Sequence, residues 1–208
     1  MTTKHLLPLL LFIITTVASA QQLYLETGKS SSSFDYKNSQ GEKLSNLQAT
    51  THNFMVLGYR DHIASFEKLN GSIGMGYTGY GAIGSDPALE GILEWNVNYL
   101  EFHAGLDYTL FNINRAAFYV KGMISTGFLL QGTQNLNNEI INLKHADDFD
   151  KTMVSFKSGA GVLLPVNNDL SFYAQYLFGK SLNQSGNKDY ESLRIKSHSI
   201  SFGVLIEL

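Results

Sequence analysis

Apolar and polar residues alternate along most of this chain, whereas the spacing of an amphipathic helix is nearly absent. Because a period of two places successive side chains on opposite faces of a β-strand, each alternating segment predicts one strand. Eight such segments follow one another: Leu23–Thr27, Thr51–Arg60, Phe66–Thr78, Ile92–Leu110, Ala116–Leu130, Val154–Leu164, Leu170–Phe178 and Ser201–Leu208.

The fourth segment changes phase between Tyr99 and Leu100. Before this point its odd-numbered residues are apolar and include Trp95, and after it the even-numbered residues are apolar and include Phe102. A slip of one residue within a strand is typical of a β-bulge, which we therefore predict at this position.

Short and long connections alternate between the segments. Short turns are expected at Asp61–His62, Asn112–Arg115 and Pro165–Asp169, where Asn, Asp and Pro supply turn chemistry. Long polar connections are expected at Ser32–Gln48, Tyr80–Gly91, Gln131–Lys151 and Asn183–Ser192. This alternation places all long loops at one end of a barrel, which is the layout of outer-membrane barrels.

The two faces of the predicted strands differ in bulk. One face carries large aromatic side chains, and the other is rich in Gly and Ser, which suit the narrow interior of an eight-stranded barrel. Membranes also require that the sheet closes, so that every backbone group is paired. We therefore predict an all-β fold, an eight-stranded antiparallel up-and-down transmembrane β-barrel whose aromatic face contacts lipid. The outward aromatic residues would include Trp95, Phe118, Phe156, Phe172 and Phe202.

Opposite charges on the less apolar face predict a lumen charge cluster. A lysine facing lipid at mid-membrane costs about 2–4 kcal/mol, so charges are better placed inside, where they can pair. The cluster consists of Glu26, Lys68, Glu101, His103, Asp107, Lys121, Lys157 and Glu207. A salt-bridged structural plug is the favoured interpretation, and a lined pore is the alternative. His103 beside carboxylates could serve acid–base chemistry, but its mid-barrel position favours a packing role.

The first 20 residues have the features of a secretory signal peptide. Met1–His5 is a short basic region, Leu6–Val17 is apolar, and Ala18-Ser19-Ala20 matches a small-x-small cleavage site. We therefore assign residues 1–20 to a signal peptide and residues 21–208 to one barrel domain. The chain contains no cysteine, and its formal charge of −3 does not suggest a nucleic-acid partner.

With these features the sequence resembles the small eight-stranded outer-membrane barrels related to OmpX and the OmpA barrel domain, particularly those common in Bacteroidota. In that family the last strand carries a signal read by the barrel-assembly machinery, with a polar residue, a glycine and two hydrophobic residues at set positions. The matching residues here are Ser201, Gly203, Ile206 and Leu208. Leu208 departs from the family, in which the last residue is usually aromatic.

The resemblance implies an integral protein of the Gram-negative outer membrane, with outer-membrane lipid and the assembly machinery as partners. We expect a non-enzymatic barrel without cofactor or metal, whose four long loops face outward for an unidentified extracellular ligand or for envelope integrity. The alternatives are a lipid A-modifying enzyme and a small-solute pore. For the enzyme, the local candidates are His198 and Ser199, but adjacent strand residues point to opposite faces and cannot act together.

Overall fold

Eight long strands form the wall of the protein in its computed structural model, which describes residues 22–37, 43, 46–63, 66–86, 91–136, 139–146, 149–182 and 192–208. The long strands are β1 (Gln22–Lys37), β2 (Gln48–His62), β3 (Leu69–Asp86), β4 (Gly91–Ile113), β5 (Ala116–Leu136), β7 (Thr152–Pro165), β8 (Leu170–Ser181) and β9 (Ser192–Glu207). The described part of the chain has no helix that is long and apolar enough to cross a membrane. The predicted signal peptide, residues 1–20, lies outside the described residues.

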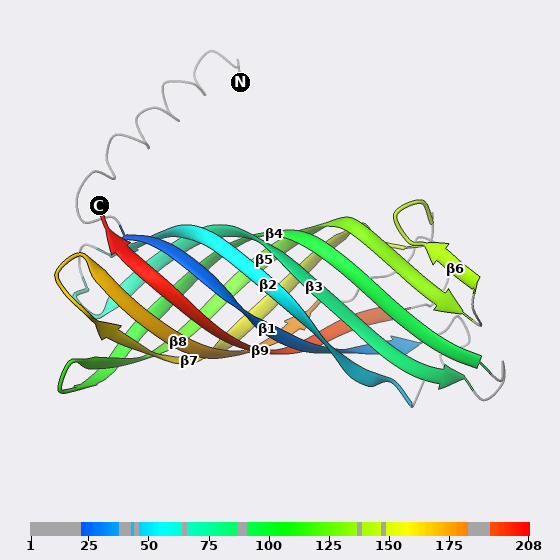
Figure 1. Cartoon of the computed structure of the whole chain (residues 1–208), viewed down its shortest axis with the longest axis horizontal. Coiled ribbons are helices and arrows are strands. Elements are labelled where there is room, and N and C mark those ends of the chain that lie inside the picture. The colour runs from blue at the N-terminus through cyan, green and yellow to red at the C-terminus, as the bar shows by residue number, and fades with distance from the viewer. Residues whose placement is uncertain are drawn as a thin grey trace, which may run out of the picture.

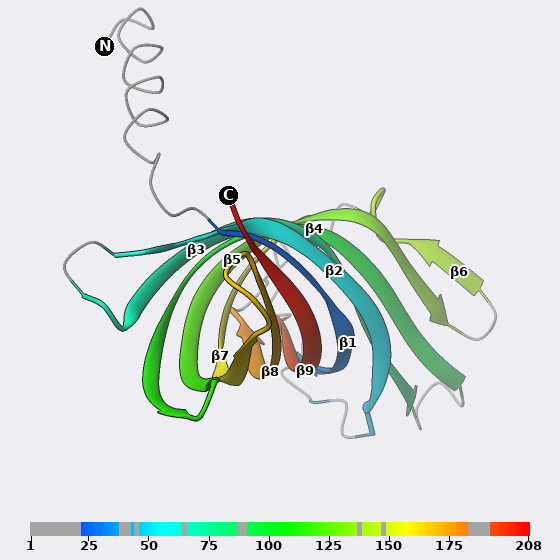
Figure 2. The ribbon, with the colours of Figure 1, turned by 60° about the vertical axis from the view of Figure 1, so that its left-hand side comes forward.

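The long strands form a closed antiparallel ring. Each pairs with the next long strand along the chain, and the pairing of β1 with β9 closes the barrel. The short strand β6 (Glu139–Asn142) pairs with β5 alone, at the end of the barrel away from the C-terminus (Figure 1). The ring is visible in the rotated view (Figure 2). The predicted eight-stranded antiparallel up-and-down barrel is confirmed.

The strand register determines the tilt of the strands. From Thr27, a row of paired residues runs through β2, β3, β4 and β5 to Thr152 on β7. In the other direction the row runs through β9 and β8 to Val162 on the same strand. The row therefore closes with a shear of 10 residues (162 minus 152). At about 3.3 Å per residue and about 4.7 Å between strands, this shear gives a tilt of about 40°.

The outer surface of the barrel carries an apolar belt. On β4, the outward side chains from Leu100 to Leu110 include no charged residue, and this length corresponds to about 25 Å along the barrel axis at this tilt. That height matches the apolar band of outer-membrane barrels, which is about 25 Å tall. Exposed belt residues include Leu25, Met55, Leu57, Ile73, Met75, Phe102, Leu106, Val120, Ile124, Phe128, Phe156, Leu164, Phe172, Phe178, Ile200, Phe202 and Ile206.

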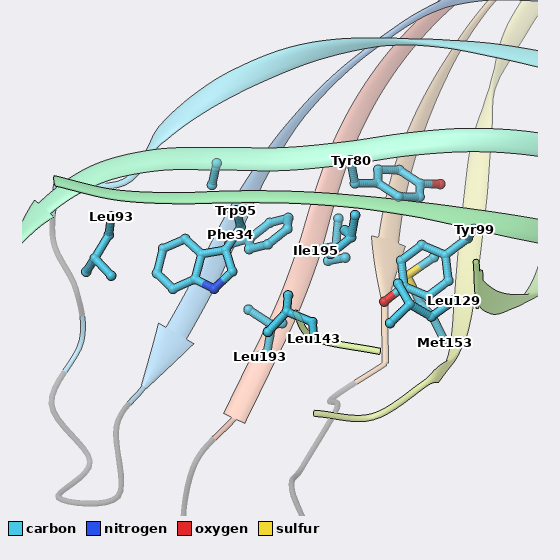
Figure 3. Packing of buried hydrophobic residues seen from close by; sticks show 12 residues of the cluster. Phe34, Tyr80, Leu93, Trp95, Tyr99, Leu129, Leu143, Met153, Leu193 and Ile195 are labelled. Atoms are coloured by element: carbon cyan, nitrogen blue, oxygen red, sulfur yellow. The ribbon is translucent and has the colours of Figure 1, made fainter. Parts of the chain in front are cut away.

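Beyond the belt the strands continue into an outer extension, formed by residues 29–37, 48–53, 79–86, 91–98, 131–136 and 192–199. Much of this extension falls in the stretches predicted as long loops, so that part of the prediction is wrong. The interior of the extension is an apolar core that includes Phe34, Trp95, Val97 and Ile195 and whose side chains converge inside the wall (Figure 3). This core stabilises strands where loops were expected.

The phase change at Tyr99 and Leu100 has a different cause from the one predicted. Odd-numbered residues of β4 point inward on both sides of it, and the extra residue lies on β5, where Leu130 is skipped between the partners of Asn98 and Tyr99. The predicted bulge in the fourth segment is therefore wrong. What changes is the side on which the apolar residues lie: they point inward from Leu93 to Tyr99 and outward from Leu100 on.

The side of the wall on which Trp95 lies also differs from the prediction. It was predicted to face lipid, but it is 5% exposed and packs inside the outer extension. Its ring centroid lies 5.9 Å from that of Phe34. In water a strand buries its apolar side chains inside, whereas in lipid the same side chains are better placed outside.

The turns at the opposite end are short. Asn114 adopts a positive φ of 54° in the turn between β4 and β5, a left-handed conformation that asparagine tolerates better than most residues. The turn between β2 and β3 begins later than predicted, because Ile63 and Leu69 pair through their backbones around it. This shift matters for Lys68, which belongs to the turn and not to β3.

Candidate functional site: a charged lumen inside the belt

Three carboxylates are buried in the lumen at the level of the belt, and each is held by its own set of donors. Glu101 on β4 lies 2.6 Å from the ammonium of Lys157 on β7. It also accepts a hydrogen bond of 2.7 Å from the Tyr80 hydroxyl and one of 3.2 Å from Thr78. The Lys157 ammonium lies 5.8 Å from the centre of the Tyr80 ring. Glu101 is therefore a fully partnered buried anion.

Asp107, further along the inward face of β4, binds an arginine. The Arg60 guanidinium on β2 donates two hydrogen bonds to it, of 2.6 Å and 3.1 Å, and Asn70 donates a third of 3.1 Å. Arg60 also donates to Gln22 at 2.8 Å. Two parallel bonds from one guanidinium form the geometry that makes arginine–carboxylate pairs strong. Arg60 was missing from the predicted cluster, although its place on the less apolar face of its segment was a usable signal.

Glu26 on β1 is held by neutral donors. The Tyr173 hydroxyl donates to it at 3.0 Å and the Gln175 amide at 2.9 Å. Gln175 in turn accepts a hydrogen bond of 3.0 Å from Tyr119. These three donors come from β5 and β8, so the network crosses the lumen from one side of the wall to the other.

Lys121 and His103 meet at the ring of Tyr24. The Tyr24 hydroxyl and the Nε2 atom of His103 are 2.9 Å apart, and the Lys121 ammonium lies 5.7 Å from the centre of the Tyr24 ring. No ion pair of Lys121 occurs within the described residues. His103 is buried and hydrogen-bonded, which agrees with a packing role and keeps it away from any open surface.

Two residues of the predicted cluster lie outside the lumen. Lys68 is exposed in the turn before β3, because β3 begins only at Leu69. Glu207 is exposed at the end of β9, where its carboxylate lies 3.5 Å from the Gln22 amide. The assignment of both to the lumen was wrong, since the alternation does not show where a strand leaves the barrel.

The lumen charges balance, and the space between them is small. Among the described residues, Arg60, Lys121 and Lys157 face the three carboxylates of the lumen. Between the described residues of the lumen lie cavities of about 20 and 30 Å³, and Lys121 lines both. A cavity needs about 10–15 Å³ to admit a water molecule, so each holds only one or two. This arrangement can fill and brace the barrel, but the cavities between these residues are too small for a solute.

The residues matched to the assembly signal lie on both faces of β9. Ser201 is buried in the lumen, and Gly203 faces the Tyr173 ring so closely that an added Cβ would overlap it. Ile206 and Leu208 point outward and are exposed. The glycine therefore has a packing reason within the barrel, while the outward residues are available to a membrane or to a partner.

His198 points outward, whereas Ser197 and Ser199 are buried inside the wall. The His198 ring instead contacts two aromatic rings, with its centroid 5.2 Å from that of Phe178 and 6.0 Å from that of Tyr176. Its Nδ1 atom is also hydrogen-bonded to the Tyr176 hydroxyl. The two serines that flank this histidine in the sequence therefore lie on the opposite face of the wall from its ring. Within the described residues, no group of three or more His, Cys, Asp or Glu side chains could hold a metal ion.

Comparison of this chain with known protein families found no match, and comparison with curated proteins likewise found none. Solved structures do share its fold. Neisserial surface protein A superposes with a TM-score of 0.50 at 12% identity, over 89% of this chain and 97% of that one. The outer-membrane protease OmpT from Escherichia coli has a TM-score of 0.50 at 8% identity, over 92% and 98%. At such identities the likeness shows the fold alone, an outer-membrane β-barrel, and this confirms the resemblance predicted from the sequence at the level of fold.

Proposed function

We propose that this protein is an integral, non-enzymatic protein of the Gram-negative outer membrane, whose closed barrel supports a rigid outer extension for interaction at the cell surface. The observation that carries the proposal is the inversion of the wall on β4. Its apolar residues face outward along the belt from Leu100 to Leu110 and inward from Leu93 to Tyr99. Such an inversion suits a barrel that leaves lipid and enters water between these two segments.

The filled lumen supports a structural role for the barrel over the pore alternative. Two ion pairs and the hydrogen bonds to Glu26 cross-brace the strands, and the cavities between these residues have room for only one or two waters each. Above this level the apolar core of the outer extension fills the interior again. A solute would have to displace both fillings.

The outer extension supports a role at the surface. Its strands pack around an apolar core and form a framework beyond the belt, and binding segments of proteins are commonly carried on rigid scaffolds of this kind. The name of the similar Neisserial protein places that protein at a surface. The extracellular ligand of our protein is proposed to bind to this extension and its connections, and the barrel-assembly machinery to read the last strand.

Fractionation of cells that express the full chain tests the membrane assignment. We expect the protein in the outer-membrane fraction, with heat-modifiable migration on SDS gels because the closed barrel resists unfolding without heating. A protein found soluble in the periplasm would refute the proposal.

Planar-bilayer recordings test the closed lumen. We expect no discrete conductance, and steady channels in the purified wild type would favour the pore.

The enzyme alternative is tested through His198, the candidate that faces outward at the belt. Lipid A from cells that express the wild type, His198→Ala or the empty vector should give the same mass spectrum. A modification that depends on the wild-type protein and disappears in His198→Ala would replace the proposed role with lipid chemistry.

A further inference from the structure

Basic side chains gather on the outside of the barrel at the outer edge of the belt. We call Lys29 on β1, Lys180 on β8, and Arg194 and Lys196 on β9 the basic patch. All four have exposed or half-exposed side chains on the outward face of three neighbouring strands. They are not part of the lumen network, and the proposed scaffold role does not require them.

The register brings three of these cations close together and places Lys29 further along, beside the apolar part. Lys196 lies directly opposite Lys180 in the β8–β9 pair, and Arg194 is two residues from Lys196 on the same face. Lys29 pairs with Ile200 and is therefore a diagonal neighbour of His198. Opposite residues of an antiparallel pair have Cβ atoms about 4.5–5.5 Å apart, and like charges at such positions disfavour the sheet.

Acidic residues do not neutralise the patch within the described part of the chain. The only ion pair found there for these four residues joins Lys196 to Asp35 at 3.5 Å, with both side chains partly exposed. Asp35 also lies opposite Arg194. One carboxylate against four cations leaves a strong excess of positive charge on this side of the barrel.

Apolar side chains continue directly from the patch on the same strands. Phe178 follows Lys180 on the outward face of β8, and Ile200 and Phe202 lie beyond Lys196 on β9. The His198 ring, packed on Phe178, lies at the boundary between the charged and the apolar parts. The surface is therefore cationic at the outer edge of the belt and apolar below it.

We propose that the basic patch binds the phosphate-bearing headgroup of a membrane lipid, whose acyl chains lie along Phe178 and Ile200. A soluble anion would use the cations but not the adjoining apolar surface, which is why we assign the patch to a lipid. Basic residues at a membrane surface are known to attract anionic headgroups in this way. The inference rests on the proposed membrane orientation, in which the patch lies at the level of the headgroups.

The test uses the full mature chain, refolded in zwitterionic detergent micelles, with phosphatidic acid and phosphatidylcholine of the same acyl length as probes. Native mass spectrometry gives the dissociation constant of each lipid. We expect tighter binding of phosphatidic acid by the wild type, and about 25-fold weaker binding by the Lys180→Gln/Lys196→Gln double variant. This factor follows from about 1 kcal/mol per lysine near an anionic headgroup and 1.4 kcal/mol per tenfold change.

The matched control is the Lys68→Gln/Lys144→Gln double variant, which removes two exposed lysines that lie outside the patch. It should bind phosphatidic acid like the wild type. Equal affinity for the two lipids, or equal losses in the two double variants, would overturn the inference. Full displacement of phosphatidic acid by millimolar inorganic phosphate would also overturn it, because the site would then be one for a soluble anion.

Failure of this inference can be told apart from failure of the proposed function. Heat-modifiable migration shows for each variant whether the barrel has folded, and insertion into phosphatidylcholine vesicles shows whether it spans a bilayer. A barrel that inserts but has no preference for phosphatidic acid refutes the lipid site alone. A wild-type protein that does not insert refutes the membrane assignment itself.

Discussion

The buried pair of Glu101 and Lys157 allows a quantitative prediction of how much one charge contributes to the stability of the barrel. Replacing Lys157 by Met keeps the aliphatic stem but removes the ammonium that lies 2.6 Å from Glu101. The carboxylate would keep its bonds from Tyr80 and Thr78, yet it would be a buried charge without a counterion. Removing one partner of a buried pair costs about 3–5 kcal/mol, so we expect Lys157→Met to lower the free energy of unfolding by that amount.

A second variant separates charge from packing. In Glu101→Gln/Lys157→Met the residue at position 101 is neutral. Its amide oxygen can still accept from Tyr80, and its amide nitrogen can donate to the Thr78 hydroxyl, which took the other carboxylate oxygen in the wild type. Replacing both charges of a buried pair is often close to neutral, so the double variant should recover most of the lost stability.

Urea unfolding in lipid vesicles, followed by tryptophan fluorescence, measures both variants. The chain has one tryptophan, Trp95, which is buried in the core of the outer extension and therefore reports on unfolding. If the double variant were as unstable as Lys157→Met alone, the loss would come from packing of the lysine stem, and a stabilising role of the charge pair would be refuted.

Two further predictions concern packing on the two faces of the wall, and a third concerns the last residue of the chain. Gly203→Ala should lower the free energy of unfolding by about 1–3 kcal/mol in the same assay, because its methyl group would overlap the Tyr173 ring; unchanged stability would show that the ring can move away. Trp95→Ala should lower the free energy of unfolding by about 3–5 kcal/mol, whereas Phe202→Ala, on the exposed outer face, should lower it much less in detergent. Heat-modifiable migration against temperature ranks the two variants. The reverse order would contradict the assigned faces. Leu208→Phe should reach the outer membrane at wild-type levels and Leu208→Asp should stall in assembly, as judged by surface labelling, and equal levels of both would argue against an assembly signal at this position.

The sequence by itself determined the class of fold and much of the site. Eight segments with a period of two predict eight strands, and lysines such as Lys121 and Lys157 on the less apolar face indicate a charged interior. This works because lipid imposes a simple rule on a closed barrel, with apolar side chains outside and every backbone group paired. Glu101 and Asp107 follow from the same alternation.

Only the tertiary structure decided which charges pair and where the membrane rule ends. Asp107 pairs with Arg60 rather than with a residue of the predicted cluster because the register, not the alternation, brings them together. They lie on the two strands that flank β3, with Arg60 opposite Ser72 and Ser72 opposite Gly105, two residues from Asp107. Trp95 and Phe202 are both aromatic residues in strands of alternating apolar and polar residues. Trp95 is nevertheless buried inside the wall, whereas Phe202 faces outward. Alternation records which face is apolar, but the side to which that face turns depends on whether water or lipid surrounds the wall, and that depends on the position of each strand along the barrel.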